Sequence, residues 1–198
     1  DISSESGTGG RATILGGSVA SSGSIDASGL NGGGEVLVGG DYQGANTNLS
    51  NAQNTLVSGT INADAIENGN GGRVILWAND LTEFPGTITV RGGDLSGNGG
   101  FVETSGKKLL SFTGSVDASS PTGETGHLLL DPVDITITTS STDGVQNTSD
   151  TWESDESTGT SILNVNDLLT SLASANVIIS TQQNATGQIA SGGADITV

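Results

Sequence analysis

The chain has 198 residues, of which 32 are glycine, three are proline and 3% are aromatic. It carries 22 acidic and five basic side chains, a formal net charge of −17, and neither cysteine nor methionine. This charge excludes nucleic acid and anionic membrane surfaces as partners, because both would be repelled. The lack of cysteine excludes disulfides and thiolate metal sites and is typical of proteins outside the cell. No apolar run approaches the ~18 residues of a membrane-spanning helix, so membrane insertion is not expected.

A glycine pair that opens a short β-run recurs through the first two thirds of the chain. The pairs are Gly9-Gly10, Gly33-Gly34, Gly71-Gly72 and Gly99-Gly100, and Thr125-Gly126 takes the same place, so the second glycines follow one another in steps of 24, 38, 28 and 26 residues. A Gly-x-Ile/Val motif alternates with these pairs at Ile25, Ile61, Ile88 and Val116, and a third run precedes it at residues 55–57, 81–84 and 109–112. Three short runs in a unit of about 27 residues, separated by glycine corners, predict an all-β, right-handed parallel β-helix with triangular coils.

Alternation within the runs assigns their two faces, because every second side chain of a strand points to the same side. The expected inward residues are Ala12, Ile14, Val36, Val38, Val74, Leu76, Val102, Thr104, Leu128 and Leu130 in the first motif, and Ile25, Ala27, Ile61, Ala63, Ile88, Val90, Val116 and Ala118 in the second. One coil cannot bury such a stripe alone, so stability must come from stacking. The enlarged second step falls on residues 41–54, which we expect to form a loop that tolerates shortening.

The regular pattern covers residues 1–136, and residues 137–198 follow a different one. A strand is expected near Ile135, and residues 139–159 have no apolar period and predict a long acidic loop. Asn164 is the expected N-cap of a short helix at about residues 165–174, with Val165, Leu168, Leu169 and Leu172 at helical spacing. Residues 177–180 and 195–198 predict resumed β-helix strands.

Five segments in order, GGRVILWAND, PGTITVRGG, GGFVETSGK, LLLDPVDITI and ILNVNDLLTSLASANVIIS, make residues 9–198 resemble the filamentous-haemagglutinin-like repeat region of large bacterial exoproteins. The resemblance implies a right-handed parallel β-helix and export through an outer-membrane two-partner secretion transporter. It also implies a secreted or cell-surface role in adhesion, aggregation or extracellular fibre formation. It brings no catalytic residues. The family's secretion-signal domain is not recognisable here, and the acidic insertion departs from the family pattern.

The residues with chemical potential are scattered, and each favours a structural role. His127 is the only histidine and lies at an outward position in the same column as Phe101. Asp26 and Asp117 share an outward column but lie three coils apart, roughly 14 Å, whereas a glycosidase pair requires roughly 5 to 9.5 Å. The turn at residues 92–98 offers oxygen ligands for Ca²⁺ but lacks a calcium-roll repeat. The acidic group Asp150, Glu153, Asp155 and Glu156 surrounds Trp152 and favours a solvated loop over a partner site.

We therefore expect a structural or adhesive segment without enzymatic activity, catalytic residues or a cofactor. Its expected partners are the secretion transporter during export, identical chains stacked end to end because neither end carries an obvious cap, and host-cell or matrix glycans. The alternative is a polysaccharide-active β-helix lyase or hydrolase. A groove that gathers three or more acids with Arg73 or Arg91 would favour that enzyme.

Overall fold

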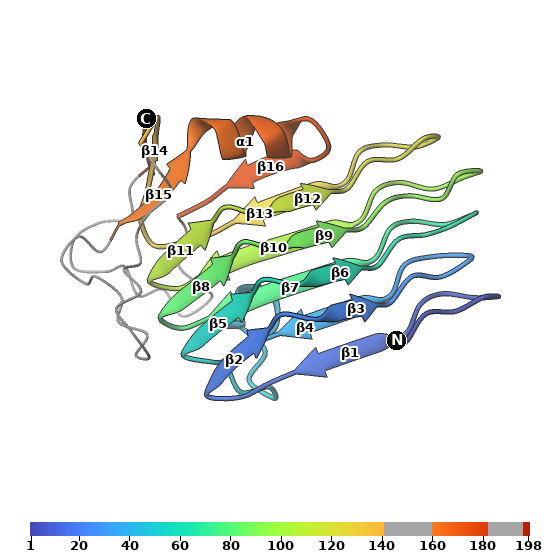
Figure 1. Cartoon of the computed structure of the whole chain (residues 1–198), viewed down its shortest axis with the longest axis horizontal. Coiled ribbons are helices and arrows are strands. Elements are labelled where there is room, and N and C mark those ends of the chain that lie inside the picture. The colour runs from blue at the N-terminus through green and yellow to red at the C-terminus, as the bar shows by residue number, and fades with distance from the viewer. Residues whose placement is uncertain (141–159, 182–195) are drawn as a thin grey trace.

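The computed structural model describes residues 1–140, 160–181 and 196–198, and its strands form parallel sheets stacked into a β-helix-like, all-β architecture (Figure 1). The largest sheet has six strands in the order β1-β4-β7-β10-β13-β16. Its members are β1 (Arg11–Ile14), β4 (Glu35–Val38), β7 (Arg73–Ala78), β10 (Phe101–Gly106), β13 (His127–Leu130) and β16 (Asn176–Ile179). We call it the main sheet. Strands far apart in the sequence are neighbours because the chain visits two other sheets before it returns.

Two four-stranded parallel sheets complete the regular coils. The second sheet contains β2 (Ser18–Ser21), β5 (Asn54–Val57), β8 (Leu81–Phe84) and β11 (Leu109–Phe112), and the third contains β3 (Ser24–Asp26), β6 (Thr60–Asn62), β9 (Thr87–Thr89) and β12 (Ser115–Asp117). A smaller sheet joins β14 (Ile135–Thr138), β15 (Ser161–Asn164) and β17 (Ile196–Thr197). The predicted coil, with three short runs and glycine corners, is thus confirmed at the level of stacked parallel sheets.

The register of the strands confirms the faces expected from alternation. Val36 pairs with Val74, and Val74 pairs with Val102, so one apolar column passes through successive coils. In the third sheet Ile61 pairs with Ile88, and Ile88 pairs with Val116. The inward side chains of all three sheets meet in one buried cluster that runs the length of the stack. Burial of these columns between coils provides the stabilisation that a single coil lacks.

The recurring glycine pair has a steric cause at the corner between the third sheet and the main sheet. A β-carbon on the first glycine of a pair, such as Gly33, would overlap the carbonyl oxygen of Ala63 in the next coil. A β-carbon on the second, such as Gly34, would overlap the carbonyl oxygen of Gly10 in the preceding coil. Both positions must therefore lack a side chain for the coils to approach to hydrogen-bonding distance.

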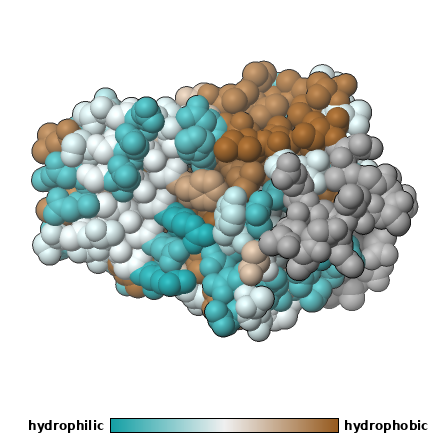
Figure 2. All heavy atoms as spheres, turned by 180° about the vertical axis from the view of Figure 1, so that it is seen from behind, coloured by the Kyte–Doolittle hydropathy of each residue, from teal (hydrophilic) through white to brown (hydrophobic). Residues whose placement is uncertain are grey.

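The end of the stack after β12 is formed by a helix and a last strand of the main sheet. Helix α1 (Val165–Leu172) begins at Asn164, whose side chain accepts the N–H of Asn166, so the predicted N-cap is confirmed. Ala118 donates its N–H to the carbonyl of Ser174, which follows the helix. The helix therefore continues the column of β12 within a coil. Figure 2 shows an apolar area at this end, where Leu169 and Leu172 of α1 and Ile178 of β16 are exposed.

The enlarged coil contains the expected loop, but this loop folds back onto the protein. Residues 41–53, which we call the strap, begin with the short 3-10 helix η1 (Tyr42–Gly44) and lie against the outer face of the main sheet. Beneath it Leu37, Ile75 and Trp77 form a second apolar cluster, separate from the core, and Leu49 of the strap packs against it. The strap thus covers an outward face that alternation alone would leave in water.

Candidate ligand groove and strap

A shallow groove crosses the coils along the corner that precedes the strands of the main sheet. Its volume is about 600 Å³. The floor consists of the four glycine pairs, and the side chains that line the groove are Thr8, Arg11, Glu35, Asn70, Arg73, Phe101 and His127. The sequence repeat therefore creates a repeated surface, in which each coil adds two glycines to the floor and one longer side chain to the wall.

In three of the four glycine pairs, the backbone N–H of the second glycine already donates a hydrogen bond within the protein and is not free to bind a ligand. The N–H groups of Gly34, Gly72 and Gly100 donate to the carbonyls of Ala27, Ala63 and Val90 at 2.8, 2.7 and 2.7 Å. These bonds close the corner between a strand of the third sheet and the next strand of the main sheet, so this part of the floor presents CH₂ groups to a ligand. Polar recognition must come from the wall.

Alternating charges form the wall over the first three coils. Arg11 Nε lies 2.8 Å from Glu35 Oε2, and Arg73 binds Glu35 Oε1 at 2.6 Å and Asp41 Oδ1 at 2.8 Å. Partial burial alone would raise the pKa of Asp41, but hydrogen bonds from the Asn46 side chain, the Tyr42 N–H and Arg73 lower this pKa to about 2. The two guanidinium groups are balanced by two carboxylates, and the wall is locally neutral in a strongly acidic protein.

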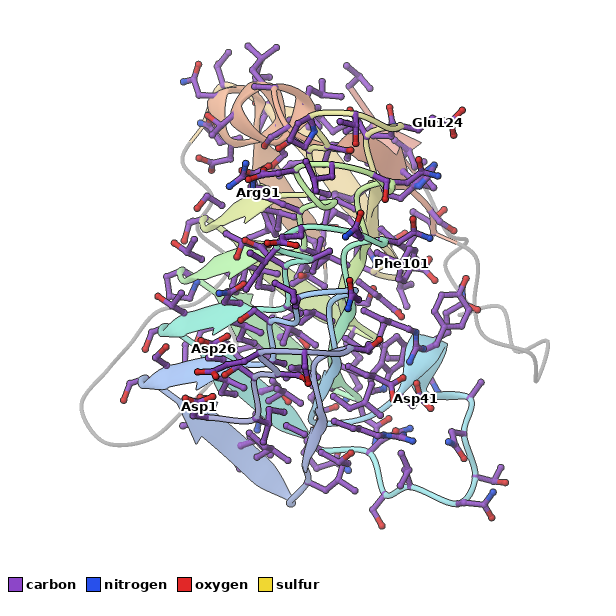
Figure 3. All side chains as sticks on the ribbon, turned by 90° about the vertical axis from the view of Figure 1, so that its right-hand side faces the viewer. Asp1, Asp26, Asp41, Arg91, Phe101 and Glu124 are labelled. Carbon is purple, nitrogen blue, oxygen red and sulfur yellow. The ribbon has the colours of Figure 1, made fainter. Side chains whose placement is uncertain are left out.

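An aromatic pair continues the wall beyond the charges. Phe101 takes the next place after Arg73 in the register, and the rings of Phe101 and Tyr42 lie 5.9 Å apart with a tilt of 56°. Such a tilted arrangement is favourable for aromatic rings. Figure 3 shows Phe101 and Asp41 on the same side of the stack. His127 follows Phe101 in the register and is exposed, as its position in the sequence predicts. The strap therefore supplies Asp41 and Tyr42 to the edge of the groove.

The strap is held to the main sheet by close contact with Trp77. A β-carbon on Gly44 in the strap, or on Gly40 just before it, would overlap the indole ring. The backbone at both glycines therefore packs directly against Trp77. Within the strap, Asp41 accepts the N–H of Tyr42 and the side-chain amide of Asn46, at 2.7 and 2.9 Å. These contacts give the strap a defined structure and bury Trp77.

Two buried acids lie on the same outer face of the main sheet. Glu103 is 0% exposed and Asp131 is 5% exposed. The backbone N–H of Gln43 donates to both carboxylate oxygens of Glu103 at 3.1 Å, and its side-chain amide donates to Asp131 Oδ2 at 3.0 Å. Burial raises the pKa of Glu103 to about 7, against the hydrogen bonds from Gln43 and Ser105, and burial also raises the pKa of Asp131.

The charged candidates of the third sheet form corners between strands. Asp26, Asn62, Thr89 and Asp117 share one outward column, as predicted. Asp26, Asn62 and Asp117 each accept the N–H of the residue two positions later, at 2.9 to 3.0 Å. This is the local bond by which Asp and Asn stabilise turns. The column therefore shapes the corner and does not bring two carboxylates together.

The remaining candidates are the turn at residues 92–98, where side chains form hydrogen bonds within the protein, and the acidic group around Trp152. At the turn of residues 92–98, Asn98 Oδ1 accepts the N–H of Glu124, and Ser96 donates to Asn68. No group of three His, Cys, Asp or Glu side chains with metal-ligand geometry occurs among the described residues. The acidic group around Trp152 lies outside the described residues.

The buried acids and the aromatic pair were not predicted from the sequence. One signal pointed to them, because Leu37 and Ile75 occupy outward positions of the first motif where an exposed strand face would carry polar residues. Glu103 and Leu129 continue that column. An apolar outward column beside an enlarged coil indicates that the extra residues cover it.

In the described part of the chain, no helix has the length and apolar character needed to cross a membrane. No protein-family model matches the sequence, and the search of curated proteins finds no match either.

Proposed function

We propose that this chain is a rigid scaffold segment of a secreted or cell-surface bacterial protein, and that it acts in adhesion to a linear, uncharged glycan. The observation that carries the proposal is the groove that the coil repeat builds beside the main sheet. Residues at the same place in successive coils line it at a spacing of about 4.8 Å. A long shallow surface with a repeated floor suits an extended polymer.

The chemistry of the groove supports a sugar chain as its ligand. The C–H faces of pyranose rings pack on aromatic side chains, which Phe101 and Tyr42 supply, and on a floor of glycine CH₂ groups. The ion-paired groups of Arg11, Glu35 and Arg73 offer donors and acceptors to hydroxyls. The net charge of −17 would repel a polyanionic chain, which favours an uncharged polymer.

The composition of the groove argues against the alternative of a polysaccharide-active enzyme. Glu35 is its single acidic lining residue among the described ones, and two arginines bind it. Glycoside hydrolysis generally requires two carboxyl groups across the scissile bond. The remaining acids near Arg73 either pair with it, as Asp41 does, or lie buried under the strap, as Glu103 does. The arrangement supports binding without turnover.

The proposal also covers the handedness of the coils, the export of the protein and its self-association. We infer right-handed coils, because connections between parallel strands are right-handed in almost all proteins. Export through a two-partner secretion transporter follows from the family resemblance alone. Self-association is supported by the exposed apolar side chains of α1 and β16.

Retention of coated beads tests the adhesive function. Beads carrying the protein are passed over cellulose, chitin, mannan and the polyanion polygalacturonate, and the released reducing ends are measured in parallel. We expect retention on at least one uncharged polysaccharide, no retention on polygalacturonate and no release of reducing ends. Tyr42→Ala should weaken retention about fivefold through lost stacking, whereas Lys108→Ala, whose side chain pairs with Asp80 away from the groove, should not.

Three outcomes would contradict the proposal. Beads that bind none of the uncharged polymers would exclude the glycan, and release of reducing ends would favour the enzyme. Retention that Tyr42→Ala and Arg11→Ala leave unchanged would place the adhesive surface outside the groove.

A further inference from the structure

One acid interrupts an otherwise apolar column beneath the strap. On the outer face of the main sheet, Leu37 pairs with Ile75, Ile75 pairs with Glu103, and Glu103 pairs with Leu129. All four side chains are buried. A carboxyl group at such a place destabilises the structure when it is charged, because burial removes its hydration. An apolar residue there would suit a permanently closed strap better.

A single strap residue holds both buried acids. Gln43 binds Glu103 through its backbone N–H and Asp131 through its side chain. Its backbone has φ of 51° and ψ of 22°, in the left-handed region that is unfavourable for a residue with a β-carbon. The hydrogen bonds to the two acids thus keep Gln43 in a conformation that the free strap would rarely adopt.

The charges that face Glu103 do not neutralise it when it ionises. Arg73 on β7 attracts it, but the guanidinium group already binds Glu35 on β4 and Asp41 on the strap. Asp131, which follows β13, repels it. Among the described Lys and Arg side chains, none forms an ion pair with Glu103 or Asp131. A charged Glu103 would therefore rely on the N–H of Gln43 and the hydroxyl of Ser105.

We propose that the strap is a pH-dependent latch, which ionisation of Glu103 beneath it loosens, so that Leu37, Ile75 and Trp77 become exposed beside the groove. The latch stands independently of whether the groove binds a glycan. When the strap is closed, the pKa of Glu103 is about 7, and when it is open, the carboxyl group returns to its ordinary value of 4.5. The closed strap therefore retains the proton more strongly, and closure is most favourable below pH 4.5.

The sign and size of the effect follow from this difference. Between pH 4.5 and about 7 the ratio of open to closed strap rises about tenfold for each pH unit, and above pH 7 it becomes constant because both states are ionised. The whole change amounts to roughly 300-fold. Opening of the strap also separates Tyr42 from Phe101 and Asp41 from Arg73, which alters one edge of the groove.

Hydrogen exchange of the folded protein tests the latch. Protection of the amides in the strap and in β7 is measured from pH 4 to 9 and corrected for the intrinsic exchange rate. We expect protection of the strap to fall by about two orders of magnitude across the window, while β9 and β12 keep theirs. In Glu103→Gln, which retains an acceptor for the N–H of Gln43 but cannot ionise, the pH dependence of strap protection should be much smaller, and what remains should come from Asp131.

A matched control separates the latch from general acid titration. Glu83 on β8 is half-buried, and burial raises its pKa too, but it faces outward on the second sheet, away from the strap. Glu83→Gln should keep the pH dependence of the strap. Quenching of Trp77 fluorescence by acrylamide in a Trp152→Phe background gives a second readout, which should rise with pH. Constant strap protection in the wild type, or an undiminished pH dependence in Glu103→Gln, would overturn the proposal.

Discussion

Gly72 lies against the carbonyl oxygen of Gly34 in the preceding coil so closely that a β-carbon at position 72 would overlap this oxygen. Gly100 has the same relationship to Gly72. Each coil therefore rests on the backbone of the one before, and the same glycines that permit stacking also form the floor of the groove.

Gly72→Ala should lower the free energy of unfolding by about 3 kcal/mol, because the added methyl group forces two coils apart. Gly17 and Gly23 are suitable controls, because a β-carbon at either position meets no atom within 4 Å and neither glycine has positive φ. Gly23→Ala should leave stability nearly unchanged or raise it slightly. Urea unfolding of the three proteins measures the difference. Equal midpoints for Gly72→Ala and the wild type would show that the corner is not tightly packed.

Ile88→Asp should unfold the stack. Ile88 is fully buried between Ile61 and Val116 in the third sheet, and an unpaired charge there costs several kcal/mol. Its neighbour Thr87 points outward and is exposed, so Thr87→Asp should melt close to the wild-type temperature. Circular dichroism during heating compares the two. If both variants melted alike, the assignment of inner and outer faces would be wrong.

The inner face could be predicted because every coil repeats it, and Val36, Val74 and Val102 each follow a glycine pair at the same distance. Strand β2 was missed because Val19 is the single large apolar residue in Ser18–Ser21, too short a pattern to indicate alternation. The hydrogen bond from Gln43 to Glu103 joins residues 60 positions apart, and Gln43 lies in a strap that belongs to no repeat. Periodicity carries no information about such a contact.

The strap should not tolerate the shortening that its place outside the repeat suggests. Removal of about ten residues from it would expose Leu37, Ile75 and Trp77, each of which contributes about 1.5 to 3 kcal/mol when buried. We expect the coils to remain folded, since their core is separate, but the protein to aggregate. Sedimentation at increasing concentration measures this. The same deletion combined with threonine at all three positions should stay dispersed, and a dispersed deletion without these substitutions would refute the covering role.

The pH dependence of stability should have two limbs, because Asp41 and Glu103 act with opposite sign. The pKa of Asp41 is lowered from 3.8 to about 2, so its contribution of about 2 kcal/mol is present above pH 3.8 and is lost as pH falls towards 2. The pKa of Glu103 is raised from 4.5 to about 7, so its contribution is complete below pH 4.5 and is lost as pH rises to 7. Unfolding in urea should therefore show maximum stability near pH 4. Asp41→Asn should flatten the acid limb alone, and Glu103→Gln should flatten the limb above pH 4.5 alone. A single variant that flattened both limbs would show that the two carboxyl groups titrate as one unit, contrary to their separate partners in Arg73 and Gln43.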